Sequence, residues 1–193
     1  MTKSELRKIY LEKRGDLSPA VRAEQSRRIA ELFFEHFDLV RIRNLHLFVT
    51  IEKFREVDTS PILSRIWSDF SHIRTSAPRV DFATGEMESA VFTADSELIE
   101  NSWGIREPSG GEPLKPEMID MVLVPLLCFD RRGHRVGYGK GFYDRFLKKC
   151  RPDCVKIGLS YFPPIDEIAD VNPGDIMLDY SVTPSGIDID RRA

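Results

Sequence analysis

One continuous stretch, residues 120–147, constrains the fold of this chain more than any other. It begins with a near-continuous apolar run over residues 121–129, the pattern of a strand buried on both faces of a parallel sheet. Residues 130–140 are polar and rich in glycine, and residues 142–147 carry apolar side chains at helical spacing. The order of buried strand, glycine loop and helix is typical of α/β proteins that bind phosphate groups. The stretch therefore predicts an α/β fold with an anion site in the loop.

The loop contains the residue types that phosphate binding requires. Gly137, Gly139 and Gly141 alternate along it, and glycine lets the backbone approach a ligand closely. The following helix offers unpaired N–H groups and the positive end of its dipole. Cationic side chains suited to phosphate oxygens accompany the glycines: Arg135, Lys140 and Arg145.

Asp144 falls in the first turn of the predicted helix. A carboxylate beside a polyphosphate is a plausible Mg²⁺ ligand, because this ion prefers oxygen and often joins one or two carboxylates to phosphates. A purely structural interpretation exists, since many βα turns are rich in glycine and a first-turn aspartate favours the helix dipole. Three alternating glycines combined with Lys140, two arginines and Asp144 favour the functional interpretation.

The loop matches neither of two common nucleotide-binding signatures. A P-loop requires glycine where this chain has His134, and serine or threonine where it has Gly141. The dinucleotide fingerprint G-x-G-x-x-G fails because the spacing here is G-x-G-x-G. The residues alone therefore indicate a phosphate or nucleotide site and leave the reaction open.

Residues 129–147, FDRRGHRVGYGKGFYDRFL, closely resemble the signature of the 5-formyltetrahydrofolate cyclo-ligases, also called methenyltetrahydrofolate synthetases. That signature reads approximately F-D-x-x-G-x-R-L-G-x-G-x-G-[YF]-Y-D, and Val136 replaces its leucine. The resemblance implies a three-layer α/β/α Rossmann-like sandwich with a mostly parallel sheet. It also implies an enzyme that uses ATP and Mg²⁺ to cyclise 5-formyltetrahydrofolate to 5,10-methenyltetrahydrofolate, through a phosphorylated formyl intermediate and with release of ADP and phosphate.

The resemblance assigns roles to individual residues. The expected catalytic residues are Lys140 and Arg145. The expected nucleotide contacts are Lys3, Arg7, Arg135, Gly137, Tyr138, Gly139, Lys140, Gly141, Phe142 and Tyr143. The expected folate contacts are Val49, Glu56, Tyr138 and Phe142. The expected metal ligands are Asp144 and Asp179.

Several of these expectations come from matches outside the signature. Lys3 and Arg7 lie four residues apart on a predicted helix and resemble a K-x-x-x-R element that contacts ATP, although such charges can simply form a solvated face. The segment E-V-D-T from Glu56 resembles one whose first acid binds the folate pterin, and a carboxylate can accept hydrogen bonds from adjacent pterin donors. Asp179 falls in a segment resembling the family's closing D-x-x-x-D-x-x-x-T.

The rest of the chain alternates between helical and strand patterns, which predicts helices on both faces of the sheet. The expected helices cover residues 3–14, 18–36 and 60–70, and the expected strands cover 45–49, 72–76, 87–93, 155–159 and 177–182. Residues 97–116 are dense in glycine and proline and are expected to form a loop. Phe82, Phe92 and Trp103 fit either the folate site or simple packing.

Composition narrows the class of protein. A chain of 193 residues with 41% hydrophobic and 31% charged residues fits a single globular domain over residues 1–193. The net charge of −3, from 28 basic and 31 acidic residues, gives no basic field for nucleic acid. No apolar run is long enough to span a membrane, and the first residues lack the hydrophobic segment of a signal peptide. With three unpaired cysteines, these features predict a cytoplasmic protein whose partners are small-molecule substrates.

Two other functions remain open alongside the enzyme. One is a regulatory module that binds a nucleotide without chemistry, and the other is a kinase or phosphatase acting on a different small molecule. The presence of Arg7, Glu56, Lys140 and Asp144 argues against the regulatory module, because a protein that only binds a nucleotide need not keep residues for both substrates. Glu56 tests the kinase or phosphatase, because it should matter for a folate and not for an unrelated acceptor.

Overall fold

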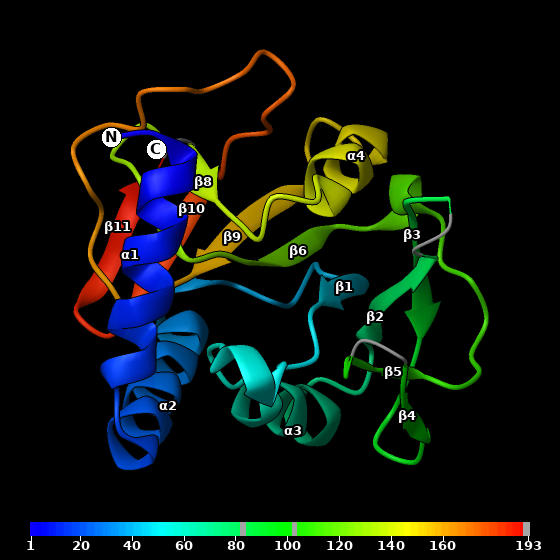
Figure 1. The fold of residues 1–193 in the computed structure, drawn as a ribbon. Helices are drawn as coiled ribbons and strands as arrows, with labels where there is room; N and C mark the ends of the chain where they lie inside the picture. The colour runs from blue at the N-terminus through cyan, green and yellow to red at the C-terminus, as the bar shows by residue number, and fades with distance from the viewer. Residues whose placement is uncertain (82–83, 102–103, 191–193) are drawn as a thin grey trace.

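The structure, a computed structural model, describes residues 1–81, 84–101 and 104–190. Phe82 and Trp103 lie outside the described residues. The described strands include a seven-stranded sheet in the order β11-β10-β9-β6-β1-β2-β3 (Figure 1). The neighbours from β10 to β2 pair in parallel, whereas β11 and β3 pair antiparallel at the two edges. The predicted α/β fold with a mostly parallel sheet is therefore confirmed.

The elements have the following bounds. The sheet strands are β1 (Asn44–Leu47), β2 (Arg74–Asp81), β3 (Glu86–Val91), β6 (Met121–Pro125), β9 (Val155–Leu159), β10 (Tyr180–Thr183) and β11 (Gly186–Asp190). The helices are α1 (Lys3–Asp16), α2 (Pro19–His36), α3 (Ser60–Asp69) and α4 (Phe142–Lys149), with short 3₁₀ turns η1 (Glu52–Phe54) and η2 (Pro116–Met118). Two small hairpins complete the described fold: β4 (Leu98–Glu100) with β5 (Arg106–Pro108), and β7 (Cys128–Phe129) with β8 (Arg135–Val136).

Local sequence signals explain where the first two helices begin. Thr2 and Glu5 form the predicted capping box at the start of α1, in which each side chain bonds the other residue's backbone N–H. Ser18 caps α2 by accepting a hydrogen bond from the N–H of Val21 at 3.3 Å, and Pro19 occupies the first helical position. These caps satisfy backbone donors that an uncapped helix leaves unpaired.

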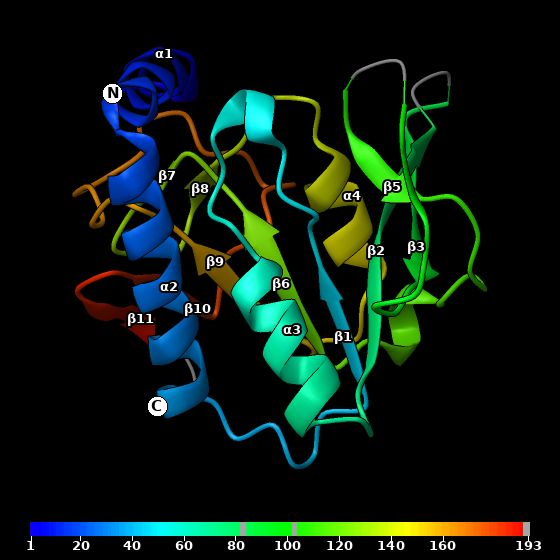
Figure 2. The same ribbon diagram turned by 90° about the horizontal axis from the view of Figure 1, so that it is seen from below.

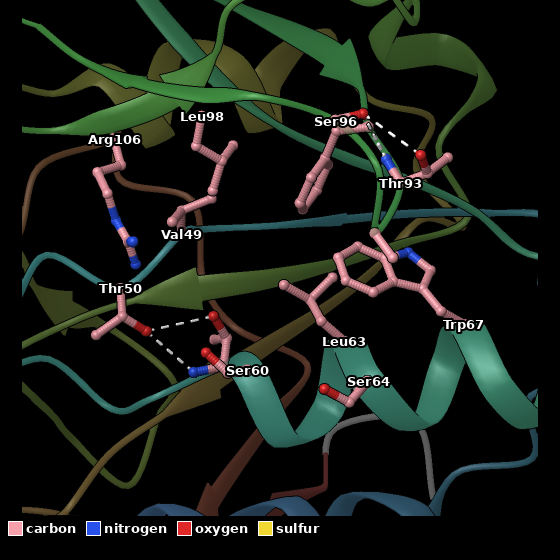
Figure 3. A pocket seen from close by; sticks show the side chains of 13 residues that line it. Val49, Thr50, Ser60, Leu63, Ser64, Trp67, Thr93, Ser96, Leu98 and Arg106 are labelled. Carbon is pink, nitrogen blue, oxygen red and sulfur yellow. Dashed lines mark hydrogen bonds between the residues drawn. The ribbon is translucent and has the colours of Figure 1, made fainter.

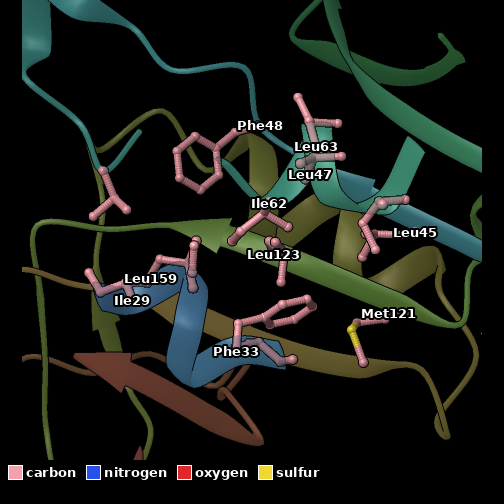
Figure 4. Packing of buried hydrophobic residues seen from close by; sticks show 14 of the residues in the cluster. Ile29, Phe33, Leu45, Leu47, Phe48, Ile62, Leu63, Met121, Leu123 and Leu159 are labelled. Carbon is pink, nitrogen blue, oxygen red and sulfur yellow. The ribbon is translucent and has the colours of Figure 1, made fainter. Parts of the chain in front are cut away.

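Helices cover both faces of the sheet, and the core has two corresponding parts. Figure 2 shows α2 and α3 on one face and α4 on the other. Alternate residues of β6 point to opposite faces, so Met121 and Leu123 pack in the α2–α3 cluster (Figure 4). Val122 and Val124 pack against α4 on the other face. The first four residues of β6 are buried, as predicted for a central parallel strand.

The predicted strand over residues 121–129 is wrong in its length. Strand β6 ends at Pro125, and the apolar residues that follow leave the sheet to form the β7–β8 hairpin. The backbone N–H of Leu127 donates to the carbonyl of Val136 at 2.7 Å and not to a sheet neighbour. The apolar run continued through the break because Leu126 and Leu127 are buried in other parts of the core.

Other predicted boundaries differ in the β2 to β5 region. Strand β2 continues through Pro78 to Asp81, although residues 72–76 were expected to end at this proline. Strand β1 pairs with β2 only as far as Ser76, so no carbonyl of β1 needs the N–H that Pro78 lacks. The N–H of Val80 on that side donates to the Glu107 carboxylate at 3.0 Å. Residues 97–116 were expected to form a loop, but they contain the β4–β5 hairpin. Strand β11 at the other edge of the sheet was also not predicted.

None of the helices in the described part of the chain combines the length and apolar character needed to cross a membrane.

Candidate active site

A buried carboxylate shapes the hairpin that carries the glycine loop. Asp130 is 0% exposed, and its Oδ1 accepts hydrogen bonds from the N–H groups of Arg132 and His134, both at 3.0 Å. Its Oδ2 accepts from the N–H of Ile168 at 3.2 Å and lies 3.2 Å from Nδ1 of His134. These contacts compensate for the lost hydration of the carboxylate and fix the turn between β7 and β8.

The glycine loop needs glycine for two different reasons. Gly139 and Gly141 have φ values of +88° and +68°, a region that disfavours residues with a side chain. A Cβ on Gly139 would also lie 3.1 Å from the guanidinium of Arg7. Gly137 does not have a positive φ, and the space around its missing side chain is open to 4 Å. Gly137 therefore leaves room beside the loop, whereas Gly139 and Gly141 shape its backbone.

Helix α1 supports this loop from outside. Nε of Arg7 donates to the carbonyl of Gly137 at 2.9 Å. Lys3 is held elsewhere, because its ammonium pairs with Asp175 and its backbone N–H donates to Asp170 at 2.6 Å. The structure thus brings Arg7 into the predicted site, while Lys3 anchors the start of α1 to the loop before β10.

Two exposed cations stand at the junction of the loop and α4. The ammonium of Lys140 has no hydrogen-bond or ion-pair partner among the described residues. Arg145 donates to the carbonyl of Lys140 at 3.2 Å and to that of Gly85 at 2.7 Å, with its guanidinium 5.3 Å from the ring centre of Phe142. Arg145 therefore ties the loop to the β2–β3 turn, and Lys140 is available to an anion.

Arg135 and Asp144 form a partly buried pair beneath the loop. Nη2 of Arg135 lies 2.8 Å from Oδ1 of Asp144, which also accepts from the N–H of Ile176 at 3.1 Å. Burial lowers the pKa of Arg135, and the neighbouring Asp144 opposes that shift. Oδ2 of Asp144 has no hydrogen-bond partner among the residues that the structure describes. One open carboxylate oxygen beside a phosphate loop fits a Mg²⁺ ion that completes its coordination with phosphates and water.

Asp179 contacts Lys156. Oδ2 of Asp179 accepts from the N–H and the ammonium of Lys156 at 2.8 and 3.1 Å. Lys156 and Asp179 lie where β9 and β10 begin, which is the amino end of these parallel strands. Among the described residues, no group of three His, Cys, Asp or Glu side chains is placed to hold a metal ion. The metal-binding role of Asp179 stays a prediction.

Glu56 is joined directly to the glycine loop. Its side chain is buried, with Oε1 accepting from the Tyr138 hydroxyl at 2.7 Å and Oε2 from the N–H of Ile51 at 2.9 Å. Burial raises the pKa of Glu56, and the two hydrogen bonds and the Arg14 charge oppose the shift. The predicted pterin acid and a predicted nucleotide contact are therefore neighbours in space.

Arg14 completes this cluster and was missed by the sequence analysis, which read the charges of the first helix as mostly solvated. It is 3% exposed and donates to the Tyr138 hydroxyl at 2.9 Å and to the carbonyls of Phe54, at 3.3 Å, and Leu126. The signal was its spacing, because Arg14 follows the buried Leu6 and Tyr10 at intervals of four along α1.

Tyr143 packs inward from α4. Its hydroxyl is buried and has no hydrogen-bond partner among the described residues. Burial raises the pKa of Tyr143, and the charge of Glu56 adds to the shift. The ring lies near that of His46, whose pKa burial lowers to about 3, so that His46 is neutral. His46 bonds the Ser89 hydroxyl at 2.8 Å and was not singled out from the sequence.

Val49 lies in the wall of a pocket (Figure 3). The pocket has a volume of about 220 Å³ and lies between α3 and the β4–β5 hairpin. Its principal lining residues besides Val49 are Thr50, Leu63, Trp67, Phe92 and Arg106. Phe92 is buried and packs edge-on against Trp67 at 5.5 Å, so it contributes to both the core and the pocket wall.

Comparison with known proteins gives one consistent family. A model of the 5-formyltetrahydrofolate cyclo-ligase family matches residues 1–184. The mitochondrial 5-formyltetrahydrofolate cyclo-ligase of Arabidopsis thaliana is 30% identical, over 89% of this chain and 70% of that protein. The 5-formyltetrahydrofolate cyclo-ligase of Escherichia coli K12 is 27% identical, over 91% of this chain and 97% of its own. The NMR structure of 5,10-methenyltetrahydrofolate synthetase from Aquifex aeolicus superposes with a TM-score of 0.83 and 30% identity, covering 100% of this chain and 94% of that one.

Proposed function

This chain is an enzyme of the 5-formyltetrahydrofolate cyclo-ligase family, and on that premise we propose that it converts 5-formyltetrahydrofolate and ATP to 5,10-methenyltetrahydrofolate, ADP and phosphate. The observation that carries the proposal is the 2.7 Å hydrogen bond between Tyr138 of the glycine loop and Glu56. A nucleotide at the loop and a pterin at Glu56 would share a border, as transfer of a phosphoryl group between them requires.

The chemistry suits residues that supply position and charge. The formyl oxygen is a poor leaving group until it attacks the γ-phosphate, which breaks the bond to ADP and makes that oxygen part of a phosphate. N10 then attacks the formyl carbon and loses its proton to solvent, and the ring closes as phosphate departs with the oxygen. Phosphoryl transfer depends mainly on alignment and charge neutralisation, so no covalent protein nucleophile is needed.

The loop residues divide this work. The Lys140 ammonium, which has no partner among the described residues, would contact the transferred phosphate, and Arg145 would hold the carbonyl of Lys140 in place. Backbone N–H groups of the loop would donate to phosphate oxygens in the space beside Gly137. Arg135 would orient Asp144, whose Oδ2 would bind Mg²⁺. The bound ion would neutralise phosphate charge.

Glu56 would hold the pterin. Its two oxygens can accept from adjacent ring N–H and amino donors, which would replace the Tyr138 hydroxyl at Oε1. Arg14 would keep Tyr138 in place, because it already donates to that hydroxyl at 2.9 Å.

The three free cysteines support a cytoplasmic, reducing location.

The test measures product and ADP together. The protein is mixed with 5-formyltetrahydrofolate and Mg²⁺, ATP is added, and the methenyl chromophore is followed by absorbance while ADP is assayed. Chromophore and ADP rising in equal amounts would support the cyclo-ligase reaction. ADP without chromophore would indicate another acceptor, and bound ATP without either product would indicate a regulatory module.

A further inference from the structure

We infer that the pocket between α3 and the β4–β5 hairpin binds the aminobenzoyl-glutamate arm of the folate, and that Arg106 binds a carboxylate of its glutamate. The inference rests on the proposed function, since it assumes that a pterin occupies Glu56. It assigns the second half of the same substrate and names a residue that discriminates folates by their charged end.

The pocket has the size and lining of a partial ligand site. Pockets that bury drug-sized ligands measure about 300–1,000 Å³, so its volume of about 220 Å³ suits part of a folate. Val49, Leu63 and Trp67 supply apolar surface for an aromatic ring, and serine and threonine hydroxyls supply polar contacts. The described residues that line it include no acid, so an anion meets no negative charge in the wall.

Arg106 is the charged member of this lining and lacks a partner. Figure 3 shows its side chain reaching from the hairpin toward Thr50 and Ser60. Glu100 faces it in the β4–β5 register, yet the Arg106 side chain forms no ion pair or hydrogen bond within the described part of the chain. Arg74 in β2, by contrast, pairs with Glu112. Arg106 is exposed, and an unpaired guanidinium in the lining of a pocket is suited to a carboxylate, which it can bind through two parallel hydrogen bonds.

A short backbone segment joins the wall of the pocket to Glu56. Val49 and Thr50 form its wall, and the next N–H along the chain, that of Ile51, donates to Oε2 of Glu56 at 2.9 Å. The Thr50 hydroxyl also donates to the carbonyl of Val57 at 3.1 Å, which closes this short segment on itself. A ligand held at Glu56 by its pterin would therefore pass over Val49 into the pocket.

The test compares two ligands that differ only at the charged end: 5-formyltetrahydrofolate and 5-formyltetrahydropteroate, which lacks the glutamate. Arg106→Gln should raise KM for the first by about tenfold or more, as expected for loss of a charge-assisted hydrogen bond. KM for the pteroate and kcat for both should change less than about twofold, and Arg106→Lys should recover part of the loss. Arg131→Gln is the matched control, because this arginine is 69% exposed and pairs only loosely with Asp166 at 3.5 Å.

An unchanged ratio of the two KM values in Arg106→Gln would overturn the assignment, whether both KM values stay level or both rise by the same factor. If that variant does not fold, Ser64→Phe tests the same pocket, because Ser64 is an exposed α3 residue in its lining. Filling the pocket should raise KM for both ligands, which share the aminobenzoyl ring. Unchanged KM values in Ser64→Phe would equally overturn the assignment.

Failure of the proposed function gives a different result. Wild-type protein that forms no methenyl product and binds neither ligand by calorimetry would refute the proposed function, and the pocket assignment with it. Wild-type turnover of both ligands with an unchanged KM ratio in Arg106→Gln would remove only the pocket assignment.

Discussion

Replacing Gly139 with alanine should destabilise the protein, whereas the same change at Gly137 should not. The methyl group on residue 139 faces two obstacles, a φ of +88° and the Arg7 guanidinium 3.1 Å away. The left-handed backbone costs about 1–2 kcal/mol for a residue with a Cβ. Displacing Arg7 weakens its hydrogen bond to Gly137, worth about 1 kcal/mol. Loss of unfolded-chain entropy returns about 0.4–1 kcal/mol, so we expect a net loss of about 1–2 kcal/mol.

Gly137→Ala is the matched control. Residue 137 lies two positions away in the same loop, has no positive φ, and has open space where the methyl group would point. Only the entropic gain of about 0.4–1 kcal/mol then applies. For a chain of this size, about 2–4 °C accompanies each kcal/mol. Tm should therefore fall by about 2–8 °C for Gly139→Ala and stay level or rise by about 1–4 °C for Gly137→Ala.

Calorimetric melting of both variants without ligand measures this difference, and urea titration provides an independent free energy of unfolding. Equal Tm values for the two variants would refute the reasoning from backbone conformation. If the proposed function is correct, Gly137→Ala should impair activity although it does not lower stability. The methyl group of Gly137→Ala would occupy space assigned to phosphate, so that variant should show a higher KM for ATP despite its normal stability.

Three further changes test other parts of the site. Because burial raises the pKa of Glu56 from 4.5, its stabilising contribution is complete below pH 4.5 and is lost as pH rises through the raised pKa. Urea midpoints should therefore decline less for Glu56→Gln than for the wild type between pH 4.5 and 8. Asp130→Ala should lose about 3–5 kcal/mol by leaving buried donors unpaired, while the exposed control Asp166→Ala should melt normally; similar Tm values would contradict this role. Lys140→Ala should lower kcat about 10²–10³-fold at unchanged Tm, and Lys148→Ala should leave both unchanged; normal turnover in Lys140→Ala would remove it from the mechanism.

The sequence predicted best the elements whose signals are local. Capping residues fixed the starts of α1 and α2, and the run of apolar residues at 155–159 matches β9 in both bounds. The apolar pattern failed at residues 121–129 because it reports burial and carries no information about pairing partners. Strand β6 and hairpin strand β7 are both buried, yet they pair with different neighbours. Only tertiary context separates them.

The sequence singled out the glycine loop, but it did not indicate which distant residues contact that loop. The alternating glycines and Lys140 indicated an anion site from composition and spacing alone, whereas the pterin role of Glu56 required family resemblance. The hydrogen bond from Tyr138 to Glu56 spans 82 positions, a relation that no local pattern encodes. Arg14 was missed because charge usually marks a solvated helix face, and its contacts with Leu126 and Tyr138 lie over a hundred positions away.

Helix α1 holds the glycine loop in place, so local unfolding of α1 would also release that loop. Its contact to the glycine loop joins Arg7 to Gly137 across 130 positions, and its anchor joins Lys3 to Asp170 across 167. Such distant contacts carry a loop-closure cost before they stabilise the chain, so we expect the loop to gain this support late in folding. A ligand that binds only the supported loop stabilises docked α1 by its own binding free energy. Amide exchange along α1 would then slow in proportion to occupancy, making the first helix a reporter of the site it supports.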